Sequence, residues 1–177
     1  MYKAKTSFAK LAIDTIFALI KDKDISKIKT KDISTEFMVK LACFVSIHMK
    51  DGSLRSCIGT IEPREENLYL EIISNAVSAS TKDSRFSPLK IDELDNIVVS
   101  VDVLSKPEII NNISELNPKK YGVIVTDGAF NRGVLLPDIE GINTIENQLN
   151  IVKRKAGLSS VENKFLKIYS FTSTRYH

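Results

Sequence analysis

A cysteine, an arginine and a histidine lie close together in one stretch of this sequence, and their side chains suit nucleophilic chemistry. Arg55 and Cys57 are separated by a single residue, and His48 precedes both. A guanidinium beside a thiol favours the thiolate, which is the nucleophilic form. An imidazole within reach can act as the base. We therefore predict Cys57, Arg55 and His48 as catalytic candidates, provided that the fold brings them onto one surface.

The segment that carries these residues is predicted to be a β-hairpin. Residues 41–49 and 54–60 are rich in strand-forming side chains, and Asp51-Gly52 lies between them. Asp-Gly between two such runs is typical of a tight hairpin turn, because the turn needs positive φ at both central residues. We expect two antiparallel strands joined by a two-residue loop.

This loop length fixes which side chains share a face. Counting back from the turn, Ser46 opposes Cys57 and His48 opposes Arg55, and directly opposed residues lie on the same side of the ribbon. Gly59 belongs to this face and leaves room for a ligand, so Ser46 and Gly59 are ligand-binding candidates. The other face is expected to be apolar and to hold Leu41, Cys43, Val45, Ile47, Leu54 and Ile58.

Other interpretations of the same residues stay open. Cys57 can equally be a small buried side chain, as we expect for Cys43 on the apolar face. His48 can be a surface residue near the turn. A three-residue loop or a bulge would shift the register by one residue and separate the cluster. Two histidines and two cysteines on opposite faces do not form a ligand set, so no metal and no cofactor are expected.

The rest of the chain predicts an α+β fold, a mainly antiparallel sheet with flanking helices. Expected after the first hairpin are a helix at 65–79, a strand at 97–104, a hairpin at 121–125 and 130–136, a helix at 144–156 and a strand at 164–172. The order of hairpin, helix and strand therefore occurs twice, which indicates an internal duplication; the alternative is that Asp-Gly hairpins are simply common. We treat residues 1–177 as one domain.

Composition narrows the class of protein. Of 177 residues, 43% are hydrophobic and 27% charged, which is enough for a packed core. The net charge of +3 is spread along the chain without a basic stripe, so nucleic-acid binding is disfavoured. No uninterrupted apolar stretch is long enough to span a bilayer. Two cysteines suit reduced thiols in the cytoplasm.

Several motifs along the chain resemble one known family. Residues 54–60, LRSCIGT, closely resemble the LRGCIGT signature of the AMMECR family, and residues 83–89, DSRFSPL, resemble its DPRFPPL segment. Residues 121–125, 133–137 and 155–158 resemble further family segments. Ser56 stands where the family has glycine. Ser84 and Ser87 replace two prolines.

The resemblance implies a larger and a smaller subdomain around a cleft beside the signature hairpin, in an intracellular protein. In microbes the family is similar to component A of the AmmeMemoRadiSam system. This similarity implies Memo-type and radical SAM proteins as partners. Thr60 ends the signature and is a further ligand-binding candidate. Arg85 can bind a small anionic ligand through a bidentate contact, with Asp83 beside it; alternatively, Asp83 and Arg85 pair locally and fix their loop.

Three functions follow as hypotheses. The first is an enzyme or enzyme component that uses Cys57 and Arg55 in the cleft. The second is a non-catalytic binding or regulatory module that docks a Memo-type or radical SAM protein, for which an exposed apolar patch near the hairpin is expected. The third, ranked last, is nucleic-acid binding. The sequence leaves the oligomeric state open.

Overall fold

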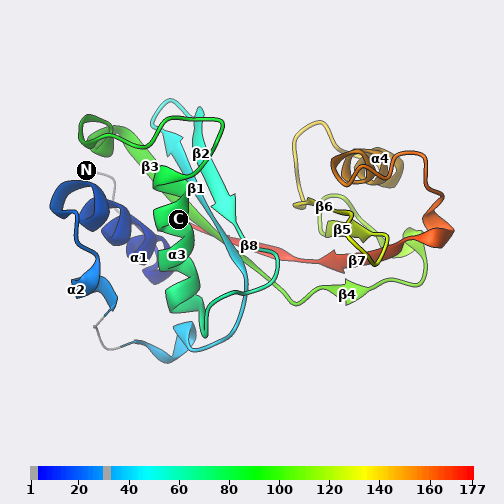
Figure 1. Ribbon diagram of the computed structural model, residues 1–177, viewed down its shortest axis with the longest axis horizontal. Helices are drawn as coiled ribbons and strands as arrows, with labels where there is room; N and C mark the ends of the chain where they lie inside the picture. The colour runs from blue at the N-terminus through cyan, green and yellow to red at the C-terminus, as the bar shows by residue number, and fades with distance from the viewer. Residues whose placement is uncertain (1–3, 30–32) are drawn as a thin grey trace. The chain divides into compact units, whose positions relative to one another are not determined.

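The computed structural model describes residues 4–29 and 33–177, and the chain divides into two units (Figure 1). The first unit comprises Met1–Leu104 together with Thr174–His177, and the second comprises Ser105–Ser173. Each unit is built on its own antiparallel sheet and its own apolar core. The two units are therefore described one at a time.

The sheet of the first unit has the strand order β2-β1-β3-β8. Its strands are β1 (Cys43–Met49), β2 (Leu54–Gly59), β3 (Ile97–Leu104) and β8 (Ser173–Tyr176). Strand β1 pairs antiparallel with both β2 and β3. The helices α1 (Ser7–Phe17) and α3 (Leu68–Thr81) lie against each other and cover one face of this sheet (Figure 1).

The alternation of side chains along β1 creates the core of this unit. Cys43, Val45 and Ile47 point to the helix side and are fully buried with the apolar faces of α1 and α3. Helix α1 is capped by Thr6, whose hydroxyl accepts a hydrogen bond from the backbone N–H of Ala9 at 3.3 Å. The alternate face of β1 points away from the helices, and it carries Ser46.

Shorter helical turns complete the first unit. A π-helical turn and a short helix, α2, follow α1, and 3-10 turns precede β1 and β3. Their bounds are Ala18–Asp22 for the π-helical turn, Ser26–Lys29 for α2, and Thr35–Phe37 and Ile91–Asn96 for the 3-10 turns.

The sheet of the second unit has the strand order β4-β7-β5-β6. It consists of β4 (Glu108–Ile109), β5 (Gly122–Thr126), β6 (Arg132–Leu135) and β7 (Lys167–Phe171), with the helix α4 (Ile145–Lys155) and the 3-10 turns Ile113–Glu115 and Asn163–Phe165. Helix α4 packs closely on β6. The distance is so short that a Cβ at Gly133 would lie 2.3 Å from the carbonyl oxygen of Val152. Gly133 thus permits the close approach of helix and strand.

Both units have the same order of elements. A hairpin (β1-β2 or β5-β6) is followed by a helix and then by a strand that pairs antiparallel with the first hairpin strand. This matches the repeated hairpin, helix and strand expected from the sequence. The predicted α+β fold with mainly antiparallel pairing is confirmed, and the structure divides the strands between two sheets. The sequence missed β4 and β8, which are short strands at the sheet edges. The predicted cleft stays a prediction.

None of the helices in residues 4–29 and 33–177 has the length and apolar character needed to cross a membrane.

Candidate functional site

The loop of the first hairpin is one residue longer than predicted. The backbone N–H of Gly52 donates to the carbonyl of Met49, and the N–H of Met49 donates to the carbonyl of Ser53, both at 2.9 Å. Residues 50–52 therefore form a three-residue loop, and only Gly52, with φ of 88°, adopts the left-handed conformation. The prediction of a two-residue loop was therefore wrong.

A bulge in β2 compensates for the longer loop. His48 pairs with Leu54, but the next residue, Ile47, pairs with Ser56, so Arg55 is the extra residue of the bulge. Beyond it, Ser46 opposes Cys57, as predicted. The predicted pairing of His48 with Arg55 was wrong, and so was the placement of Leu54 on the apolar face: Leu54 opposes His48 and is 40% exposed.

The thiol of Cys57 is half-buried on the face that points away from the helices, where the Ser46 hydroxyl donates to its Sγ at 3.2 Å. Burial raises the pKa of Cys57 above the ordinary thiol value, and the charges of Asp102 and Asp83 add to this increase. The hydrogen bond from Ser46 and the charge of Arg85 act in the opposite direction but do not outweigh it. The surroundings of Cys57 therefore favour the neutral thiol over the thiolate.

Arg55 is engaged by a carboxylate rather than by the thiol. Its Nε lies 2.6 Å from Oε1 of Glu93, and its Nη2 donates to Oε2 of Glu93 at 3.1 Å and to the carbonyl of Ser87 at 3.0 Å. The ring of Phe86 lies 5.8 Å from the guanidinium. The expectation that Arg55 promotes the thiolate is thus not supported; the arginine whose charge acts on Cys57 is Arg85.

Asp83 and Arg85 pair with each other and close the open edge of β2. Nε and Nη2 of Arg85 donate to the two carboxylate oxygens of Asp83 at 2.9 and 2.7 Å. The backbone N–H of Cys57 donates to Asp83 at 2.9 Å, and Arg85 donates to the carbonyl of Cys57 at 3.3 Å. The pair therefore occupies the backbone groups that an edge strand leaves free.

The environment of Asp83 is strongly polar although its side chain is buried. The hydrogen bonds from Arg85 hold the pKa of Asp83 far below its usual range, with a further contribution from the Cys57 N–H. The hydroxyl of Ser56 also lies 3.3 Å from this carboxylate and donates to the carbonyl of Ala79 at 2.5 Å. Ser56, the departure from the family signature, thus adds a contact between β2 and the end of α3.

Two further ligand-binding candidates have structural partners. The Thr60 hydroxyl donates to the buried carboxylate of Glu71, which also accepts the backbone N–H groups of Arg64 and Glu65. At Gly59, a Cβ would lie 2.3 Å from the Phe44 ring. The room that we expected in front of Gly59 is therefore filled by a side chain of the neighbouring strand.

Asp102 and Arg175 also belong to the face that carries Ser46, and neither was predicted from the sequence as a site residue. Asp102 opposes Phe44 on the neighbouring strand, is 3% exposed, and accepts hydrogen bonds from Nε of Arg175 at 3.0 and 3.2 Å. The signal was present in residues 99–103, VSVDV, where polar residues alternate with valines. Arg175 lies in β8, a strand that the pattern did not reveal.

The charges of this ion pair act on His48. Partial burial and the charge of Arg175 lower its pKa, while the charge of Asp102 opposes that effect. A neutral imidazole is the form that can accept a proton. The predicted role of His48 as a base for Cys57 stays a prediction.

A shallow pocket of about 360 Å³ lies beside the hairpin. It is lined by Arg55, Phe86, Ser87, Lys90, Asp92 and Glu93. Leu54 and Ile91, which adjoin pocket residues in sequence, are 40% and 61% exposed. Within the part of the chain that the structure describes, no three His, Cys, Asp or Glu side chains converge on a position for a metal ion.

This protein combines an α+β fold of two sheets with an LRSCIGT hairpin whose edge is bound by Asp83 and Arg85. Comparison with known families identifies the class of protein that has these features. The model of the AMMECR1 family matches residues 9–176, so the chain belongs to this family. The match extends through both structural units.

Relatives in bacteria and archaea support this membership. A Thermotoga maritima protein is 55% identical over 140 residues, covering 79% of each chain. A Clostridium acetobutylicum protein is 48% identical over 143 residues, covering 80% of this chain but only 30% of that longer protein. The crystal structure of an uncharacterized protein from Pyrococcus horikoshii matches with a TM-score of 0.83 at 30% identity, covering 95% of this chain and 88% of that one.

Proposed function

We propose that this chain is a non-catalytic binding module whose signature hairpin presents a fixed surface to a partner protein. The observation that carries the proposal is that the polar groups of the signature are engaged within the first unit. Arg55 binds Glu93, and Asp83 with Arg85 holds both backbone groups of Cys57. These contacts hold the hairpin in place, which suits a surface for recognition.

The state of the thiol also favours binding over catalysis. A nucleophilic cysteine needs a lowered pKa or an adjacent base. Burial raises the pKa of Cys57, and its hydrogen-bond partner at Sγ is the hydroxyl of Ser46. A hydroxyl that donates to sulfur is a poor base for the thiol proton.

The surface beside the hairpin has the mixed character of a protein-binding site. Arg55 and Phe86 form a wall of the pocket, and aromatic and arginine side chains are enriched where proteins bind one another. The exposed Leu54 and Ile91 add apolar area next to it. Their exposure supports the proposal, because a docking module requires apolar surface near the hairpin. The partner that we propose is a Memo-type or radical SAM protein, in the cytoplasm.

Complex formation with purified proteins tests this function. The chain is titrated by calorimetry with a Memo-type protein and with a radical SAM protein from the same organism. We expect a complex with one of them, weakened at least about tenfold by Ile91→Asp. Ile109→Asp is the matched control, because Ile109 is 58% exposed, like Ile91 at 61%, but lies in the second unit. The absence of binding to both proteins, or equal loss in the control, would refute the proposal.

Thiol chemistry is the second candidate, and one observation favours it. Cys57 shares its face of the sheet with Ser46 and Asp102, so a reacting group placed there would meet several polar side chains. To bind an arginine here, a small anionic substrate would also have to break the ion pair of Arg85 with Asp83 or that of Arg55 with Glu93. A measurement of the pKa of Cys57 distinguishes thiol chemistry from the proposed binding function.

A further inference from the structure

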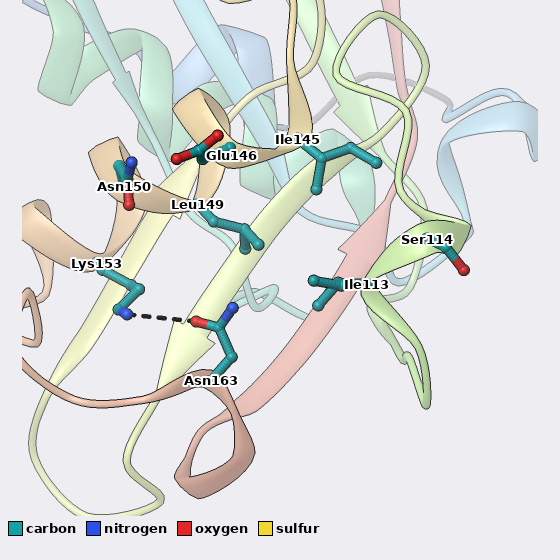
Figure 2. A pocket seen from close by; sticks show the side chains of 8 residues that line it. All are labelled: Ile113, Ser114, Ile145, Glu146, Leu149, Asn150, Lys153 and Asn163. Atoms are coloured by element: carbon teal, nitrogen blue, oxygen red, sulfur yellow. Dashed lines mark hydrogen bonds between the residues drawn. The ribbon is translucent and has the colours of Figure 1, made fainter.

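The second unit contains a pocket that the proposed function does not use. It has a volume of about 400 Å³ and lies between α4 and the two 3-10 turns, Ile113–Glu115 and Asn163–Phe165 (Figure 2). This volume is in the range of sites that take small organic molecules. All the residues that line it belong to the second unit, so the site is complete within that unit.

The side chains that line the pocket change from apolar to cationic along α4. Ile145, Leu149 and Lys153 are spaced four residues apart, so they form one stripe on the helix surface. Ile113 faces this stripe from the opposite wall (Figure 2). The stripe therefore runs from two apolar side chains to one cation.

Two hydrogen-bond donors meet at the cationic end. Nζ of Lys153 donates to Oδ1 of Asn163 at 3.3 Å. An ammonium carries three N–H groups, so this bond leaves two of them for a ligand. The same bond fixes the Asn163 amide with its nitrogen on the side of Ile113 and Leu149 (Figure 2). A carboxylate can accept from both groups at once.

We propose that this pocket binds an amphipathic monocarboxylate with a medium-length alkyl chain. The alkyl chain lies against Ile145, Leu149 and Ile113, and burial of its methylene groups supplies the attraction. The carboxylate accepts hydrogen bonds from Lys153 and Asn163. The reverse orientation is disfavoured, because it would place the anion at the end of α4 that carries Glu146.

Octanoate is the probe for this site, and methyl NMR of the whole chain is the measurement. We expect saturable chemical-shift changes at the methyl groups of Ile113, Ile145 and Leu149. Lys153→Gln should weaken the binding by about tenfold, the effect of losing one charge-assisted hydrogen bond. Arg154→Gln is the matched control, because it removes the same charge from the neighbouring, exposed position of α4.

The probe also has a matched control. 1-Octanol carries the same chain without a charge, so it forms no charge-assisted hydrogen bond with Lys153, and its binding should be about tenfold weaker than that of octanoate. Ile113→Trp fills the pocket from a position that is 42% exposed, and it should abolish octanoate binding in a folded chain. Unchanged methyl signals with millimolar octanoate, equal binding of 1-octanol, or undiminished binding to Lys153→Gln would each overturn the proposal. So would methyl shifts that follow protein concentration alone, since a second copy would then be the occupant.

Discussion

At the scale of single residues, Asp83 has the largest structural role in the candidate site. Its carboxylate accepts hydrogen bonds from Arg85 and from the backbone N–H of Cys57, and the Ser56 hydroxyl lies 3.3 Å from it. Hydrogen bonds to a charged group are stronger than those between neutral groups. One side chain thus joins the loop after α3 to the edge strand of the signature hairpin.

Replacement of Asp83 should therefore destabilise the fold. We expect Asp83→Asn to lower the free energy of unfolding at pH 7 by about 2–3 kcal/mol, because a charged acceptor with several donors is lost. Urea unfolding measures the change. Asp95→Asn, at an exposed carboxyl of the same segment, is the control and should change the free energy little.

The pH dependence of this effect has a definite sign. The pKa of Asp83 is lowered in the folded chain, so the stability it contributes is present above the unfolded value, about 3.9, and is lost as pH falls below it. The difference in unfolding free energy between the native chain and Asp83→Asn should shrink as pH falls through about 4. A difference that stays constant down to pH 2 would show that the charge of Asp83 is not the cause.

Some of the residue contacts in the candidate site could be predicted from the sequence. Ser46 was placed opposite Cys57 correctly, and local pairing of Asp83 with Arg85 was one of the two stated alternatives. The partner of Arg55 could not be found in the same way. Glu93 is 38 positions away in the chain, and only the path of the loop after α3 brings it to the hairpin.

At the scale of elements, the first hairpin combines a long loop with a bulge. The Asp51 carboxylate accepts from the backbone N–H and the hydroxyl of Ser53, at 2.9 and 2.6 Å, which stabilises the three-residue loop. Asp-Gly correctly predicted a hairpin, but the loop length depends on this side-chain contact. The bulge at Arg55 depends on tertiary contacts, so periodicity could not reveal it. The predicted register at Cys57 was correct because the two deviations cancel.

The close contact of β1 and β2 at Gly59 gives a test at this scale. Gly59→Ala should destabilise the first unit by about 1–3 kcal/mol, because its Cβ would meet the Phe44 ring at 2.3 Å and the carbonyl oxygen of Cys43 at 2.5 Å. Thermal unfolding measures the loss. The double variant Gly59→Ala, Phe44→Ala should show a favourable coupling energy, since it removes the first of these clashes. Additive effects would indicate that Gly59 is needed for another reason.

At the scale of the whole molecule, two units with separate cores share one order of elements. The sequence revealed this order because each hairpin carries its own Asp-Gly turn and is followed by a helix. It did not reveal β4 and β8, since strands this short have no measurable periodicity. The strand β8 brings Arg175 to Asp102, so the polar face of the first sheet could not be completed from sequence.

Separate cores predict that a local defect is confined to its own unit. Gly133→Ala places a Cβ against the backbone of α4, so amide hydrogen exchange should accelerate in β5, β6 and α4. Protection in β1, β3 and α3 should change less. Hydrogen exchange with mass spectrometry measures both sets of peptides. Equal acceleration in the two units would show that they unfold as one.

The most direct test of the whole account is the pH dependence of iodoacetamide alkylation at Cys57 in the native chain, followed by mass spectrometry. Because burial raises the pKa of Cys57, we expect a midpoint above that of a free thiol, about 8.5, and slow labelling at pH 7. Ser46→Ala should raise the midpoint further, since it removes a hydrogen bond that lowers the pKa. Cys43, whose pKa is raised to about 12, should stay unlabelled until the chain unfolds. A midpoint for Cys57 below that of a free thiol, with rapid labelling at pH 7, would contradict the account and identify Cys57 as a reactive nucleophile.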